Sequence, residues 1–175
     1  MRSSDLLVSE RDGVYSVRVS GRANFEYAVP LREIAKGQSV FRSLVIDLGP
    51  CTAMDSTFMG VLTMLALKTR RDNTKMTLYN ASPALQKLLR DLGVIKLFTF
   101  AEGAVELPET AAAGAEGPGL LDTAETLSEA HRTLIDAEPA NREKFRDVVA
   151  FADADVRRLK EENGREGTSS PENAN

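Results

Sequence analysis

The chain has 175 residues, of which 42% are hydrophobic and 27% charged, and its formal net charge is -4. This length suits one domain of ordinary size plus an additional segment, and the acidic balance argues against nucleic acid or an anionic membrane surface as the partner. The single cysteine, Cys51, excludes an internal disulfide and a cysteine metal cluster, and the single histidine, His131, removes most hydrolase and metal schemes.

The first predicted elements are two strands, a hairpin turn and a helix. Residues 6–9 are mostly apolar. Residues 14–19 alternate apolar with polar residues as a half-buried strand does. Asp12-Gly13 between them is a turn pair, so we expect a β-hairpin. Residues 27–35 have helical spacing, with Pro30 in the first turn and Gly37 as the stop.

The middle of the chain alternates strands and helices. Residues 44–48 form a short apolar strand, residues 49–53 a loop, and residues 58–68 a helix that is apolar on most sides. A strand over 75–79, a helix that starts at Ser82-Pro83 and stops at Gly93, and a strand over 95–100 follow. The order β-β-α-β-α-β-α-β predicts an α/β fold with a mixed sheet, largely parallel after an antiparallel hairpin.

The C-terminal part has a different composition. Residues 1–107 form the predicted domain, and residues 108–119, rich in Ala, Gly, Glu and Pro, are predicted to be a linker. Two helical patterns fill residues 120–163, the first over about 120–137 and the second from about residue 139, and together they predict a helical hairpin. Residues 164–175 are polar and predicted to be disordered.

The segment most suggestive of function is Asp55-Ser56-Thr57, which lies between the apolar strand and the apolar helix. It places a modifiable serine at a helix N-terminus, where free N–H groups and positive potential can hold a phosphate. Asp55 or Ser56 could instead serve only as a helix cap, and the two roles are compatible. No glycine-rich phosphate loop and no metal cluster is visible, so no cofactor and no metal are expected.

The segment from Leu44 to Leu65 resembles the STAS domain of bacterial anti-sigma factor antagonists. The resemblance covers residues 5–106, and Gly21 after the second strand and Ser82-Pro83-Ala84 before the third helix also fit the family pattern. It implies a binding protein, not an enzyme, that binds an anti-sigma factor of the serine-kinase type. It also implies that this kinase phosphorylates Ser56, that a serine phosphatase reverses the modification, and that Asp55 is the preceding acid.

The resemblance implies a partner surface around the serine and in the loop after the second strand. Its residues are Arg22, Asn24, Phe25, Asp55, Ser56, Thr57 and Phe58. Thr57 is either a second acceptor or faces inward. Phe58 stands where many members have glycine, so the kinase or partner surface is expected to differ there. Phe25 could instead pack into the core.

Three further residues carry open alternatives. Asp47 is expected either to contact a partner or a nucleotide, or to be merely solvated at the end of its strand. Cys51 is expected to be a packed or loop thiol. His131 is expected on a solvated or packed helix face without a catalytic role.

The C-terminal helices fall outside the resemblance. They could fold back on the domain, or form a homodimer or partner-docking element through residues 120–163. If they reached the serine loop they could gate partner access, although nothing in the sequence places them there. The alternative function is therefore a non-catalytic scaffold or oligomerisation module of a signalling complex.

We also expect a cytoplasmic protein without a membrane span. Residues 1–5 lack the apolar core of a signal peptide, and no apolar run approaches the ~18 residues that a span requires.

Overall fold

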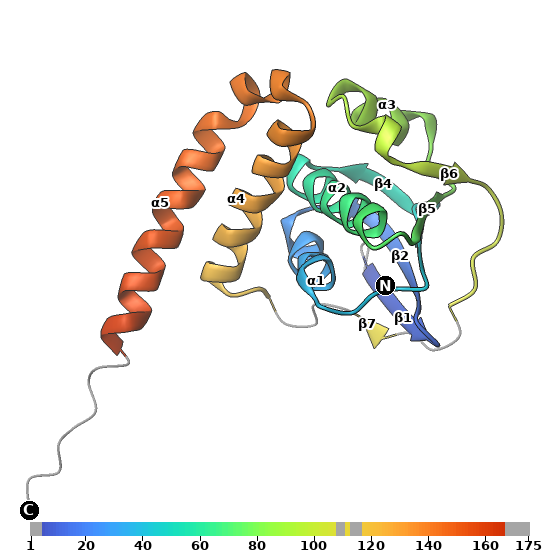
Figure 1. The fold of residues 1–175 in the computed structure, drawn as a ribbon, viewed down its shortest axis with the longest axis horizontal. Helices are drawn as coiled ribbons and strands as arrows, with labels where there is room; N and C mark the ends of the chain where they lie inside the picture. Colours follow the sequence, from blue (N-terminus) through green and yellow to red (C-terminus); the bar gives the residue numbers. More distant parts are fainter. Residues whose placement is uncertain (1–4, 108–110, 113–116, 167–175) are drawn as a thin grey trace, which may run out of the picture.

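The structure is a computed structural model that describes residues 5–107, 111–112 and 117–166. A sheet lies on one side, helices cover one of its faces, and two C-terminal helices lie outside those helices (Figure 1). The strands are β1 (Asp5–Arg11), β2 (Val14–Ala23), β3 (Ser43–Asp47), β4 (Cys51–Met54), β5 (Lys75–Tyr79), β6 (Thr99–Ala101) and β7 (Ala111–Ala112). The helices are α1 (Phe25–Lys36), α2 (Ser56–Arg71), α3 (Pro83–Asp91), α4 (Leu120–Ala137) and α5 (Arg142–Glu166), with short 3-10 helices η1 (Ile95–Leu97) and η2 (Pro139–Asn141).

The predicted mixed α/β sheet is confirmed. Its order is β6-β5-β3-β2-β1-β7, and β4 pairs with the end of β2. β1 and β2 form the expected antiparallel hairpin, whose turn needs the positive φ of Asp12 and Gly13, and β2, β3, β5 and β6 run parallel. Alternate residues such as Val17 and Val19 are buried under the helices.

Two predicted loops contain strands. Residues 51–54 form β4, because β2 continues past a bulge at Gly21 (φ 74°) and pairs with them. In the predicted linker, residues 111–112 pair with β1, and residues 108–110 and 113–116 lie outside the described residues. Pairing of such short runs depends on distant backbone, which local periodicity does not reveal.

Two other predictions were wrong in detail. The strand predicted over 95–100 is η1 followed by the three-residue strand β6. The first helix begins at Phe25 because Asn24 caps it, with its Oδ1 accepting from the backbone N–H of Glu26 at 3.0 Å. Pro30 therefore lies inside α1 and not in its first turn.

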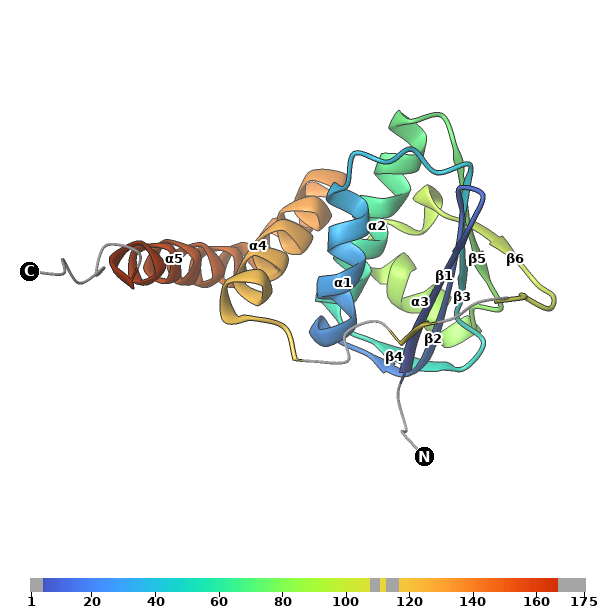
Figure 2. The same ribbon diagram turned by 90° about the horizontal axis from the view of Figure 1, so that it is seen from below.

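The predicted pair of C-terminal helices is present. Figure 2 shows α1 and α2 between the sheet and α4, with α5 on the outer side of α4. α5 continues to Glu166, so the prediction of disorder was wrong for residues 164–166, and residues 167–175 lie outside the described residues. None of the helices described combines the length and apolar character that crossing a membrane requires.

A buried ionic clamp attaches α4 to α1. Arg32 on α1 is 4% exposed, and its guanidinium donates two hydrogen bonds of 2.9 Å to the carboxylate of Glu129 on α4. Glu125 accepts a further bond from Arg32 at 3.3 Å. Because a guanidinium is buried only where carboxylates satisfy it, this contact fixes the position of α4 along α1.

Candidate functional site

Ser56 is the first residue of α2, directly after the cap residue Asp55. An Asp55 carboxylate oxygen accepts a hydrogen bond of 2.8 Å from the backbone N–H of Phe58, which is the expected helix cap. The backbone N–H of Asp55 donates to the carbonyl of Ala23 at 2.9 Å. The start of α2 is therefore joined to the end of β2, and the half-buried Ser56 lies beside the loop that follows β2.

The two residues after Ser56 turn inward. Thr57 is 4% exposed and Phe58 is 0% exposed, so Thr57 takes the inward orientation and Phe58 is one of the largest core side chains. The expectation that these side chains belong to a partner surface is therefore wrong. The second and third residues of α2 lie on the face that packs on the sheet, and an aromatic ring there contributes to the core.

The hydroxyl of Ser56 is hydrogen-bonded to His131 of α4. Ser56 Oγ lies 2.9 Å from His131 Nε2, and His131 Nδ1 lies 2.7 Å from the carbonyl oxygen of Leu127. A carbonyl only accepts, so Nδ1 carries the proton. Nε2 of the neutral ring is then an acceptor, and Ser56 donates its hydroxyl proton to it.

Burial governs the charge of this group of residues. His131 is 2% exposed, and burial lowers its pKa against the opposing effects of the Leu127 carbonyl and the Asp55 carboxylate. Burial also raises the pKa of Asp55, while the backbone N–H groups of Phe58, Phe25 and Thr57 act in the opposite direction. Burial therefore favours the uncharged imidazole, the state in which Nε2 accepts from Ser56.

The loop after β2 lies where the sequence analysis expected it, next to the serine. Arg22 is exposed, Phe25 is 39% exposed, and Asn24 is occupied as the cap of α1. Phe25 is therefore not a core residue. Arg22 lies in β2 opposite Ala53, and Phe25 is the first residue of α1, whose backbone N–H acts on the Asp55 carboxylate next to Ser56.

Asp47 is buried at the end of β3 and is not solvated. It is 5% exposed, and its carboxylate accepts hydrogen bonds from Arg18 at 2.9 Å, Gly49 N–H at 3.0 Å and Asn80 at 3.1 Å. Those bonds outweigh the opposing effect of burial, which is the largest single influence, and lower the pKa of Asp47. The group connects the middle of β2 with the ends of β3 and β5. Cys51 is packed, as expected, and burial raises its pKa.

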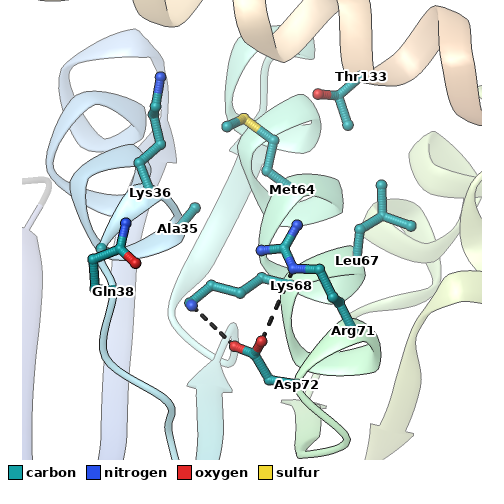
Figure 3. Close-up of a pocket in the computed structure, with 10 residues that line it drawn as sticks. Ala35, Lys36, Gln38, Met64, Leu67, Lys68, Arg71, Asp72 and Thr133 are labelled. Atoms are coloured by element: carbon teal, nitrogen blue, oxygen red, sulfur yellow. Dashed lines mark hydrogen bonds and ion pairs between the residues drawn. The ribbon is translucent and has the colours of Figure 1, made fainter.

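A cavity of about 540 Å³ lies at the opposite end of α2 from Ser56, between the ends of α1 and α2 and beside α4 (Figure 3). Its cations are paired within the chain: Lys68 Nζ lies 3.0 Å from Asp72, and Lys36 Nζ lies 2.6 Å from Glu129. The C-terminal ends of α1 and α2 add negative potential. The lining still holds more cations than acids, since Lys36, Lys68 and Arg71 face the single carboxylate of Asp72. The cavity lies away from the start of α2, however, and Ser56 remains the candidate site.

His131 is the residue that sequence reasoning missed. The histidine lies on the apolar stripe of its helix, so its burial could have been predicted from the spacing of Ala124, Leu127, Ala130, His131 and Leu134. Its hydrogen-bond partner could not have been predicted in this way, because the bond joins residues that are 75 positions apart.

Comparison with known proteins identifies the domain. The family model of the STAS domain matches residues 5–106. The chain belongs to the STAS domain family. The match ends before α4, so the helix that contacts Ser56 lies outside the STAS domain. No curated protein matches the chain.

Three solved structures are similar to the STAS domain. Two are of SpoIIAA, an anti-sigma factor antagonist in its unphosphorylated form and the Bacillus cell fate determinant in its phosphorylated form. Each has 14% identity and a TM-score of 0.49 over 57% of this chain, and the chain covers 89% and 91% of them respectively. The third is an anti-sigma factor antagonist from Mycobacterium paratuberculosis, with 25% identity and a TM-score of 0.45 over 56% of this chain and 85% of that one.

Proposed function

We propose that this STAS domain protein is an anti-sigma factor antagonist that binds a serine-kinase-type anti-sigma factor and is switched off by reversible phosphorylation of Ser56. The observation that carries the proposal is the position of Ser56. It is the first residue of α2 in a STAS domain, follows the cap residue Asp55, and lies next to the end of β2, to which the Asp55 backbone N–H is bonded through Ala23.

The chemistry of this position suits a phosphorylation switch. The N-terminus of α2 offers N–H groups and positive potential for a phosphate. Phosphorylation adds about -1.5 to -2 charges at neutral pH, next to the Asp55 carboxylate and at the centre of the proposed binding surface. Desolvation and repulsion of this charge would weaken partner binding by about 1–3 kcal/mol, the usual size of coupling between linked events.

The partner surface proposed here consists of Ser56, Asp55, Arg22 and Phe25, with Asn24 shaping the loop as a helix cap. Phe58 and Thr57 support this surface from beneath, since their side chains lie in the core. A serine phosphatase that restores the Ser56 hydroxyl would make this switch reversible. The protein itself acts by binding and needs no catalytic group of its own.

The test uses each serine-kinase-type anti-sigma factor encoded in the genome of origin, purified and incubated with the full chain and ATP. We expect intact-mass measurement to show one added phosphate on the native chain and none on Ser56→Ala. Thr52→Ala is the matched control, because Thr52 is an exposed hydroxyl residue on β4, close in sequence to Ser56. Equal modification of the native chain and Ser56→Ala would refute the proposal, as would calorimetry giving Ser56→Asp the native affinity.

The alternative function is a scaffold module that self-associates through α5. α5 packs mainly against α4, and Phe151 on it is 75% exposed. Light scattering of the full chain over a concentration series tests this. An oligomer that Phe151→Glu dissociates would favour the scaffold, and a monomer at all concentrations would exclude it.

A further inference from the structure

α4 approaches α2 most closely one turn away from Ser56. A Cβ atom added to Gly60 would lie 2.4 Å from the carbonyl oxygen of Ala130, so the two backbones leave no room even for a methyl group. Gly60 and Ser56 are four residues apart and therefore share a face of α2. Ala130 directly precedes His131, so the tight crossing and the Ser56–His131 hydrogen bond belong to one contact.

The imidazole at this contact is enclosed on several sides. Its Nδ1 is occupied by the Leu127 carbonyl, its Nε2 by Ser56, and its ring lies 4.9 Å from the ring of Phe145 on α5, measured between centroids. His131 therefore cannot swing away without disturbing α5. The serine hydroxyl is held by both C-terminal helices at once, through His131 and the aromatic ring behind it.

Phosphorylation would reverse the chemistry of this hydrogen bond. Ser56 Oγ–H now donates to Nε2, but transfer of a phosphoryl group to Oγ removes that proton and leaves an ester oxygen with three further acceptor oxygens. The lone pair of His131 Nε2 would then face the phosphate oxygens, which are acceptors and repel it. Rotating the phosphate towards solvent also leaves Nε2 without a donor, and a buried acceptor without a partner is destabilising.

We propose that the helical pair α4–α5 is a cover over Ser56, and that docking of this cover and phosphorylation of Ser56 exclude each other. The inference rests on the proposed phosphorylation of Ser56 and names its regulation. The docked cover shields the hydroxyl from the kinase, and the phosphorylated serine drives the cover off, since coupling between two events is reciprocal.

The contacts of α4 suit a segment that can separate from the domain. Its large buried apolar residue is Leu134, and the remaining buried residues are small or polar. A surface of this kind gains less from burial than the Leu- and Phe-rich core under α2. The Arg32–Glu129 clamp specifies where the cover docks, and its charged groups can be hydrated once it leaves.

The first experiment needs no kinase. Hydrogen exchange measured by mass spectrometry on the full chain follows the peptides of residues 120–137 in the native chain, in Ser56→Asp and in Ser56→Ala. We expect exchange in Ser56→Asp to be faster by roughly tenfold, within the range of typical coupling between linked events. Ser56→Ala also leaves Nε2 without its donor but adds no charge and no acceptor, so its exchange should rise less than that of Ser56→Asp. Native or slower exchange in Ser56→Asp would overturn the inference, since an ion pair with a protonated His131 would slow it.

The second experiment opens the cover without touching Ser56. Gly60→Ala places a methyl group against the Ala130 carbonyl while α2 keeps a good helix former. Gly164→Ala on α5 is the matched control, because among the described residues no atom outside its own stretch of helix lies within 4 Å of its added Cβ. We expect faster exchange over residues 120–137 and faster phosphorylation by the kinase in Gly60→Ala, and native behaviour in the control.

The outcomes separate the two proposals. An open cover with an unchanged phosphorylation rate overturns the gating. If Gly60→Ala does not fold by circular dichroism, Glu129→Gln replaces it, since it weakens the clamp from the α4 side. If no kinase modifies Ser56 in any variant, the proposed function fails, whereas the exchange of Ser56→Asp still decides whether added negative charge at Ser56 displaces α4.

Discussion

Ser56 on α2 and His131 on α4 form a hydrogen bond of 2.9 Å between Oγ and Nε2, although 75 positions separate them in the chain. One partner is the STAS-domain serine at which we propose phosphorylation, and the other is the single histidine of the chain, outside the STAS domain. The contact brings the C-terminal helices to the start of α2. Through this hydrogen bond the C-terminal helices contact the candidate site directly.

The first prediction concerns pH. Because burial lowers the pKa of His131 in the folded protein, the unfolded chain takes up this proton first as the pH falls. The free energy of unfolding should be fully retained above about pH 6.5 and should fall below it, by at most about 1.4 kcal/mol per pH unit for one proton. Urea titrations at pH 7.0 to about 5.5 measure this above the range where carboxylates titrate.

His131→Gln is the control for the pH dependence, because it keeps a polar side chain and cannot titrate. Its free energy of unfolding should be flatter over the same range. Asp55 opposes the effect, since its raised pKa makes the folded state bind a proton more readily as the pH falls. Equal slopes for the native chain and His131→Gln would contradict the assignment of the buried neutral imidazole.

The second prediction concerns the clamp between α1 and α4. Arg32→Ala leaves the half-buried carboxylate of Glu129 without its bidentate partner, so the protein should lose about 1–3 kcal/mol of stability, below the loss for a fully buried pair. Arg158→Ala is the control, because Arg158 forms exposed pairs along α5 and its loss should have no measurable effect. Denaturant unfolding of both variants measures the difference, and native stability of Arg32→Ala would refute the role of the clamp.

The third prediction concerns the aromatic residue at the start of α2. Phe58→Ala should destabilise the protein by about 3–5 kcal/mol, because it removes a fully buried ring from the core. Phe151→Ala removes the same ring from the exposed side of α5 and should change stability by no more than about 0.5 kcal/mol. Similar losses in the two variants, measured by urea unfolding, would show that Phe58 does not support the site from the core.

Local patterns were enough for most of the fold. The alternation in residues 14–19, the apolar helix after Asp55 and the cap at Ser82 each depend on neighbours in sequence, and the structure keeps all three. β4 and β7 escaped prediction because each is short and exists only through pairing with β2 or β1. Phe58 was assigned to the surface because its orientation depends on how α2 packs on the sheet.

The sequence by itself determined that Asp55 and Ser56 lie at the start of a helix, with one of them as its cap, and that His131 lies on a later helix. Both follow from spacing within a few residues, which acts through local hydrogen bonds and helical periodicity. Only the tertiary structure decided that this later helix covers α2 at Gly60 and that His131 meets the serine hydroxyl. The crossing of α2 and α4 depends on the shapes of their side-chain surfaces and on the Arg32 clamp. The periodicity of a single helix predicts neither of these.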